Sequence, residues 1–203
     1  MAIDYKKELE SAAKSMILVH EPDVLIKLVV RLVVQKVKVK HAGILLHQKE
    51  NNTYLLSVSR GPLGLKIPPG FALMDMDNPL IKLLKEHRDK SILTNGALVY
   101  EDAKRVLARN KTMSFSLQEL LEKVLYQLEI FDVSVCIPSY FREELLGVML
   151  LGGKRNGRGF GNDELDFFSA LTSDVAMAIR NARLFKELEN ESKSLSKEIN
   201  FKK

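Results

Sequence analysis

The sequence predicts an α+β fold, an α/β sandwich in which a central antiparallel sheet of about five or six strands lies between two layers of helices. Two pairs of short apolar segments, each joined by a tight turn, indicate hairpins and therefore antiparallel pairing. Amphipathic helical patterns at both ends of the chain predict a terminal-helix layer on one face, with shorter helices and loops on the other. The 203 residues, 46% of them hydrophobic, suit one well-filled core.

The N-terminal part predicts two helices. Apolar residues recur at helical spacing over 4–19, and Pro22 is well placed in the first turn of a second helix that continues to about Lys36. The break at 20–22 separates a flanking helix, 1–21, from the domain that follows.

The middle of the chain begins with a hairpin, formed by apolar segments at 41–47 and 53–59 around a turn at 48–52. Glycine and proline then mark a loop over 61–70. Asn78 followed by Pro79 predicts the start of a short helix, and 90–94 resembles a further strand.

The segment 95–114 has no sustained period and is expected to be a loop, with a helical turn near 102–107. Ser116 is expected to cap the next helix, with Glu119 completing a capping box.

Two strands, 133–140 and 145–152, follow and are joined by a turn at Arg142 and Glu143. A long amphipathic helix, capped by Asn162 or Asp163, closes the chain.

This last part, 133–189, resembles the GAF domain family. The resemblance is carried by Ile137 and Pro138 at the end of a strand, by ELLGVMLLGGKR at 144–155, by Gly157 and Phe160, and by DELDFFSALTSDVAMAIRNARLF at 163–185. It implies a GAF-like domain over 22–185 and a coiled-coil extension over 186–203. It also implies a regulatory part of a histidine kinase, cyclase or transcriptional regulator, whose output domain follows in the same chain or lies on another protein.

In the GAF family the ligand cavity lies on the sheet face opposite the terminal helices. Strand alternation places Ser134, Cys136 and Pro138 on that face. The segments expected to cover it contribute the remaining candidates: Phe71, Leu93, Tyr100, Phe115, Leu121 and Val124. The alternative is an ordinary filled core without a ligand, in a module that only holds two chains in register.

Catalysis is not expected. The four histidines are scattered, and the glycine run at 152–159 lacks the Lys-Ser/Thr ending of a phosphate loop. One GAF-fold enzyme, the free methionine sulfoxide reductase, uses several cysteines, whereas this chain has only Cys136. No cysteine precedes the penultimate helix, so no covalent bilin is expected, and the NKFDE-type signature of cyclic-nucleotide-binding GAF domains is absent.

The helical flanks predict a parallel homodimer, because an apolar seam with charged shoulders continues past residue 182. The expected interface residues are Leu9, Ala13, Met16, Val175, Ala178, Ala182, Phe185, Leu188 and Leu195. No membrane or nucleic-acid partner is expected, since the apolar runs are interrupted by charge and the basic run at 36–41 lacks aromatics. Without a signal-peptide pattern at its N-terminus, the chain is expected to be cytoplasmic.

Overall fold

The structure, a computed structural model, describes residues 7, 11, 21–61, 72–87, 92–109 and 113–201, without the side chains of 22, 58 and 196–201. The helix expected over 4–19 and the loop at 62–70 lie outside the described residues. Six strands form one antiparallel sheet in the order β3-β2-β1-β6-β5-β4. The strands are β1 (Ala42–Gln48), β2 (Thr53–Arg60), β3 (Leu73–Met74), β4 (Leu98–Val99), β5 (Val135–Phe141) and β6 (Glu144–Leu151). This confirms the predicted fold class.

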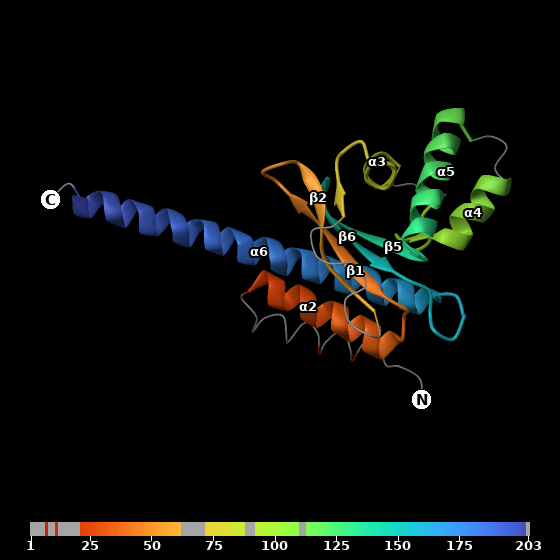
Figure 1. Ribbon diagram of the computed structural model, residues 1–203, viewed down its shortest axis with the longest axis horizontal. Coiled ribbons are helices and arrows are strands. Elements are labelled where there is room, and N and C mark those ends of the chain that lie inside the picture. Colours follow the sequence, from red (N-terminus) through yellow and green to blue (C-terminus); the bar gives the residue numbers. More distant parts are fainter. Residues whose placement is uncertain are drawn as a thin grey trace.

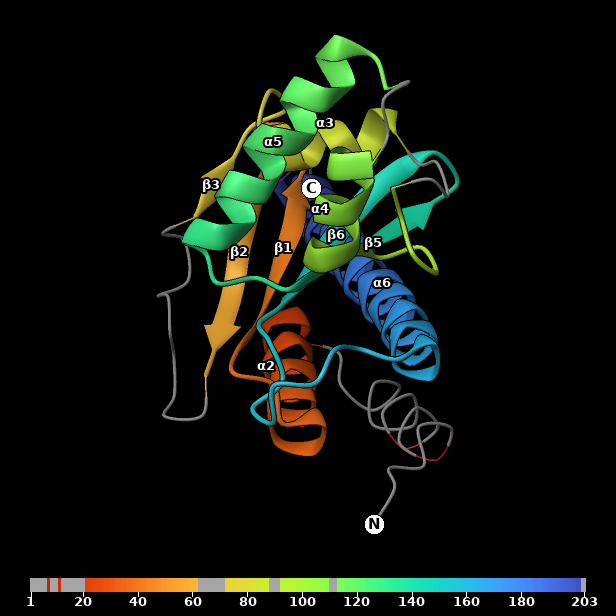
Figure 2. The ribbon, with the colours of Figure 1, turned by 90° about the vertical axis from the view of Figure 1, so that its right-hand side faces the viewer.

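The helices divide between the two faces of the sheet. They are α2 (Pro22–Leu32), continued by the π-helical turn η1 (Val33–Val37), α3 (Pro79–Glu86), α4 (Tyr100–Arg109), α5 (Phe115–Ile130) and α6 (Asn162–Phe201). Figures 1 and 2 show α2 and α6 side by side on one face, and α3, α4 and α5 over the other. Beyond the sheet, α6 projects as a single helix (Figure 1).

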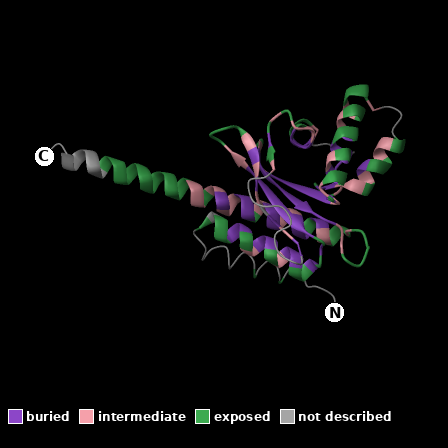
Figure 3. Cartoon of the chain, viewed as in Figure 1, coloured by how far each residue is buried: buried purple, intermediate pink, exposed green. Residues whose placement is uncertain are grey.

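Two apolar clusters, one on each face, make up the core. On the helix-paired face, Val29 of α2 and Phe168 of α6 pack with Ile137 of β5. On the opposite face, Leu121 of α5 packs with Cys136. The strand alternation predicted for β5 is therefore confirmed, and Figure 3 shows burial concentrated in the sheet and the helix faces against it.

Local capping explains where the shorter helices begin. Asn78 caps α3 as predicted, because its Oδ1 accepts a hydrogen bond from the Leu80 N–H at 3.0 Å. For α5 the prediction was wrong by two residues: Ser114 has the extended backbone of a cap, and its Oγ accepts from the Leu117 N–H. Ser116 lies inside the helix, and Glu119 pairs with Lys123 in place of closing a capping box.

The start of α6 also differs from the prediction. The carbonyl of Gly161 accepts the first helical hydrogen bonds, so Gly161 stands at the cap position before Asn162. The Glu164 carboxylate accepts from the Gly161 N–H at 2.8 Å and pairs with Lys154 at 2.7 Å. These contacts fasten the beginning of α6 to the loop that leaves β6.

The segment 95–114 is more ordered than predicted. It contains strand β4 and the ten-residue helix α4, in which only Ala103 is buried, so little apolar pattern was present to reveal it. The short strand expected at 90–94 is displaced: Ile92 and Leu93 are not in a strand, Thr94 forms only an isolated bridge, and the pairing with β5 begins at Leu98. Its residues 90 and 91 lie outside the described part.

Gly147 allows the central strands to lie close together. A Cβ atom there would lie 2.6 Å from the Leu45 carbonyl oxygen of β1, nearer than any relaxed contact allows. We expect Gly147→Ala to lower the free energy of unfolding by about 1–3 kcal/mol, because the strands must separate to admit the methyl group. Urea unfolding followed by circular dichroism measures this.

Gly159→Ala is the matched control, because no heavy atom lies within 4 Å of a Cβ built there. Its stability should equal or slightly exceed that of the unaltered chain. Equal stabilities for the two variants would contradict the close approach at Gly147.

Candidate functional site

Five of the nine expected ligand residues meet on the sheet face opposite α2 and α6. Cys136 and Leu93 lie in one buried cluster with Leu121 and Val124 of α5, and Tyr100 packs at its edge. The structure therefore brings these side chains together where the sequence placed them.

The other four expected residues do not join that cluster as ligand contacts. Pro138 is buried within β5 opposite Val148. Ser134 precedes β5 and uses its backbone to bond β6 and the start of α4. Phe115 is 81% exposed, because nine residues, about two and a half helical turns, separate it from Val124 and place it on the opposite side of α5. Phe71 lies outside the described residues.

The space behind Cys136 is filled by the chain's own side chains. Cys136 has no exposed surface, and Leu83, Leu98 and Leu128, each at most 1% exposed, belong to the same cluster. A cavity of about 10 Å³ lies farther along this face beside His41, about the size of one water molecule. Neither that cavity nor the groove described next reaches Cys136 among the described residues.

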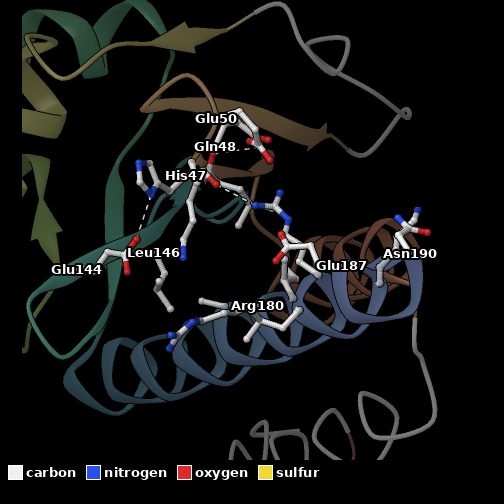
Figure 4. A pocket seen from close by; sticks show the side chains of 15 residues that line it. His47, Gln48, Glu50, Glu144, Leu146, Arg180, Glu187 and Asn190 are labelled. Atoms are coloured by element: carbon white, nitrogen blue, oxygen red, sulfur yellow. Dashed lines mark hydrogen bonds and ion pairs between the residues drawn. The ribbon is translucent and has the colours of Figure 1, made fainter. Parts of the chain in front are cut away.

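A larger groove, of about 280 Å³, lies between the β1–β2 turn and α6 (Figure 4). Residues 46–50, at the end of β1 and the start of the β1–β2 turn, form one wall with Glu144 and Leu146 of β6, and α6 between Ala176 and Asn190 forms the other. No expected site residue lines it. The sequence signal for this groove is the pair of cations Arg180 and Arg183, three residues apart on the last helix.

His47 contacts β6, the β1–β2 turn and α6, the three elements around this groove. Its Nδ1 lies 3.3 Å from the Glu144 Oε1, within reach of an ion pair when the imidazole is protonated. Its Nε2 is 3.1 Å from the Asn52 Oδ1, and its ring stacks on Tyr54 with centroids 4.9 Å apart. Arg183 of α6 donates to the His47 carbonyl at 2.9 Å, so the turn and the helix are directly bonded.

Arg180 lines the groove one turn earlier on α6. Its guanidinium carbon lies 3.9 Å from the centroid of the Phe141 ring, in a cation–π contact. Its Nε is buried and has no hydrogen-bond partner among the described residues. Arg180 therefore has one buried donor without an acceptor among the described residues.

The expected dimer residues separate into two groups. Val175 is only 2% exposed, because it lies two turns after Phe168 on the sheet-facing stripe, and it is not available to a second chain. Phe185, Leu188 and Leu195 are 78%, 62% and 54% exposed. Ala178 and Ala182 are half-buried. Leu9, Ala13 and Met16 lie outside the described residues.

The described ranges contain no group of three or more His, Cys, Asp or Glu side chains arranged to hold a metal ion. Within the same ranges, no helix is both long enough and apolar enough to span a bilayer.

No protein-family model matches the sequence. No curated protein matches it significantly. Solved structures match the fold at low identity. The GAF domain of a phosphoenolpyruvate-protein phosphotransferase from Coxiella burnetii has 15% identity and a TM-score of 0.61, covering 91% of this chain and 97% of its own.

Two further similar structures carry different functions. A phycoerythrobilin-bound GAF domain from a cyanobacterial phytochrome has 14% identity and a TM-score of 0.60, covering 92% of this chain and 100% of its own. Free methionine-R-sulfoxide reductase from Neisseria meningitidis has 10% identity and a TM-score of 0.57, covering 91% of this chain and 95% of its own. The chain therefore has the GAF fold, and its function must be argued from its own residues.

Cys136 provides a direct test of the closed space behind β5. Burial raises the pKa of its thiol, so the thiol stays protonated and unreactive at neutral and mildly alkaline pH. We expect a chromogenic disulfide reagent to leave the folded chain unmodified and to react with one thiol per chain after unfolding in guanidinium. Rapid reaction of the folded chain would show that the space opens.

Proposed function

We propose that this chain is a cytoplasmic regulatory module of the GAF fold that pairs with a second copy through α6 and passes a conformational change along that helix to an output domain. The observation that carries the proposal is α6 itself. Its 40 residues correspond to about 60 Å of helix, far more than the sheet can cover.

The projecting half of α6 has the pattern of a helix that pairs. Phe185, Leu188 and Leu195 are exposed, as is Leu184, among side chains that are otherwise charged or polar. With Ala178 and Phe185 at heptad position a, Leu188 and Leu195 fall at position d, which defines a seam facing away from the sheet. A helix this long without tertiary contacts is marginal in water, and pairing along the seam would stabilise it.

In this proposal 22–185 form the domain, 186–203 the coiled-coil extension and 1–21 a flanking helix that joins the bundle. The partners are a second copy and an output domain in the same chain or on another protein. The filled space behind Cys136 favours a relay without a ligand at the usual GAF cavity.

Leu188→Asp should abolish pairing. Each dimer would lose two buried leucine side chains and bury two carboxylates in their place, which weakens association by more than about a hundredfold, ~3 kcal/mol. Analytical ultracentrifugation over a concentration series measures the effect.

Ser194→Asp is the matched control, because it introduces the same carboxylate on the outward face of the projecting helix, where Ser194 is exposed. It should sediment like the unaltered chain. A chain that is monomeric at high micromolar concentration without any substitution would contradict the proposal.

Leu188→Cys tests the direction of pairing. In a parallel, in-register pair the two position-d thiols face each other, so oxidation should produce a disulfide-linked dimer on a non-reducing gel. The chain without this substitution is the control, because Cys136 is buried. An antiparallel pair would place the two thiols too far apart, and the variant would then stay uncrosslinked.

A further inference from the structure

The groove between the β1–β2 turn and α6 has the composition of a binding site for a small, partly apolar anion. Its floor is formed by apolar side chains from both elements, among them Leu146 of β6 and Ile179 of α6. Figure 4 shows His47, Gln48 and Glu50 of the turn on one side and Arg180, Glu187 and Asn190 of α6 on the other.

Cations exceed anions around this groove by one charge. Lys49, Arg180, Arg183 and Lys186 line it, against Glu50, Glu144 and Glu187, so the formal balance is four positive and three negative charges. Of the three carboxylates, that of Glu144 already lies beside His47. A singly charged anion would balance the lining, whereas a polyphosphate would meet excess negative charge from the glutamates.

Arg180 and Arg183 also have N–H donors that are not used in hydrogen bonds among the described residues. Arg180 Nε is buried without an acceptor, and a buried donor left unpaired costs about 1–3 kcal/mol. Arg183 uses one N–H for the His47 carbonyl, and neither arginine has an ion pair among the described residues. Guanidinium groups present paired N–H donors that match the two oxygens of a carboxylate.

We propose that this groove binds a small monocarboxylate with a short apolar body. The carboxylate contacts Arg180 and Arg183, and the apolar part lies on the Leu146 and Ile179 floor. A volume of about 280 Å³ suits a metabolite-sized ligand and not a larger cofactor. This site lies on the helix-paired side of the sheet, away from the space behind Cys136.

Such a ligand acts directly on α6. A carboxylate that accepts a hydrogen bond from Arg183 binds the same guanidinium that donates to the His47 carbonyl. Binding therefore adds a contact to the side chain that joins β1 to α6. The site would supply a signal to the relay proposed above, but its occupancy does not require a dimer, because its described lining comes from one chain.

Isothermal titration with hexanoate tests the site. We expect saturable binding to the unaltered chain, no binding of 1-hexanol, which has the same carbon chain without the charge, and weaker binding of inorganic phosphate. Absence of hexanoate binding, or phosphate binding as tight as that of hexanoate, would overturn the assignment.

Arg180→Gln should weaken hexanoate binding at least about tenfold, since it removes a charge-assisted pair of hydrogen bonds. Arg142→Gln is the matched control: Arg142 also lies over the Phe141 ring, at 5.4 Å, and its loss changes the net charge equally, but it does not line the groove. Equal affinities for the two variants would contradict the site.

The Leu188→Asp variant separates this proposal from that of the dimer. Its affinity for hexanoate should equal that of the unaltered chain, because residue 188 does not line the groove. Loss of hexanoate binding in this variant would overturn a site formed within one chain. If the variant does not pair but still binds hexanoate, the carboxylate site is supported independently of the coiled coil.

Discussion

The pairing of β6 between β1 and β5 is the constraint on which the rest of the structure depends. It joins strands from the two halves of the chain at the centre of the sheet, and both neighbours are antiparallel to it. Because β1 follows α2 and β6 precedes α6, this pairing brings the end of α2 and the start of α6 to the same edge of the sheet. At Gly147 the lack of a side chain leaves room for the Leu45 carbonyl, which would lie 2.6 Å from a Cβ atom there.

Contacts around the loop after β6 then fix the position at which α6 begins to cross the sheet. Lys154 and Glu164 form a shielded ion pair, and the same carboxylate accepts from the Gly161 N–H at the helix cap. Arg155 donates to the carbonyls of Val39 and of Val34 in η1, which ties the loop to the segment that leads into β1. The start of α6 is therefore held by contacts to the loop that follows β6 and to the segment that precedes β1.

Elements with a strong apolar period could be predicted from the sequence, and those held by polar or backbone contacts could not. The β1–β2 and β5–β6 hairpins, α3 and α6 follow from alternation and helical spacing. By contrast, α4 buries only Ala103, and β4 is two residues long and exists through its pairing with β5. The start of α5 was misplaced because Ser114 and Ser116 are equally suitable caps by residue type, and only backbone geometry distinguishes them.

The candidate site was harder to predict for a physical reason. The cluster around Cys136 follows from alternation on one strand, but whether it is hollow depends on how side chains from α3 and α5 fill it. The groove beside Arg180 depends on the β1–β2 turn lying against α6, with His47 and Arg183 separated by 136 positions in the chain. No local pattern encodes such a contact.

The position of that contact on α6 matters for how a change could travel. Up to Ile179 the helix is held against the sheet by buried side chains, and from Leu184 onward the described side chains are exposed, so Arg183 lies at the boundary. Between 162 and 201 the sequence contains neither glycine nor proline, the residues at which helices most often kink. A rotation of α6 at its bond to the His47 carbonyl would therefore move the projecting half as one element. In the proposed pair, the exposed seam on that half would then turn relative to the second chain, which is the coupling that the proposed relay requires.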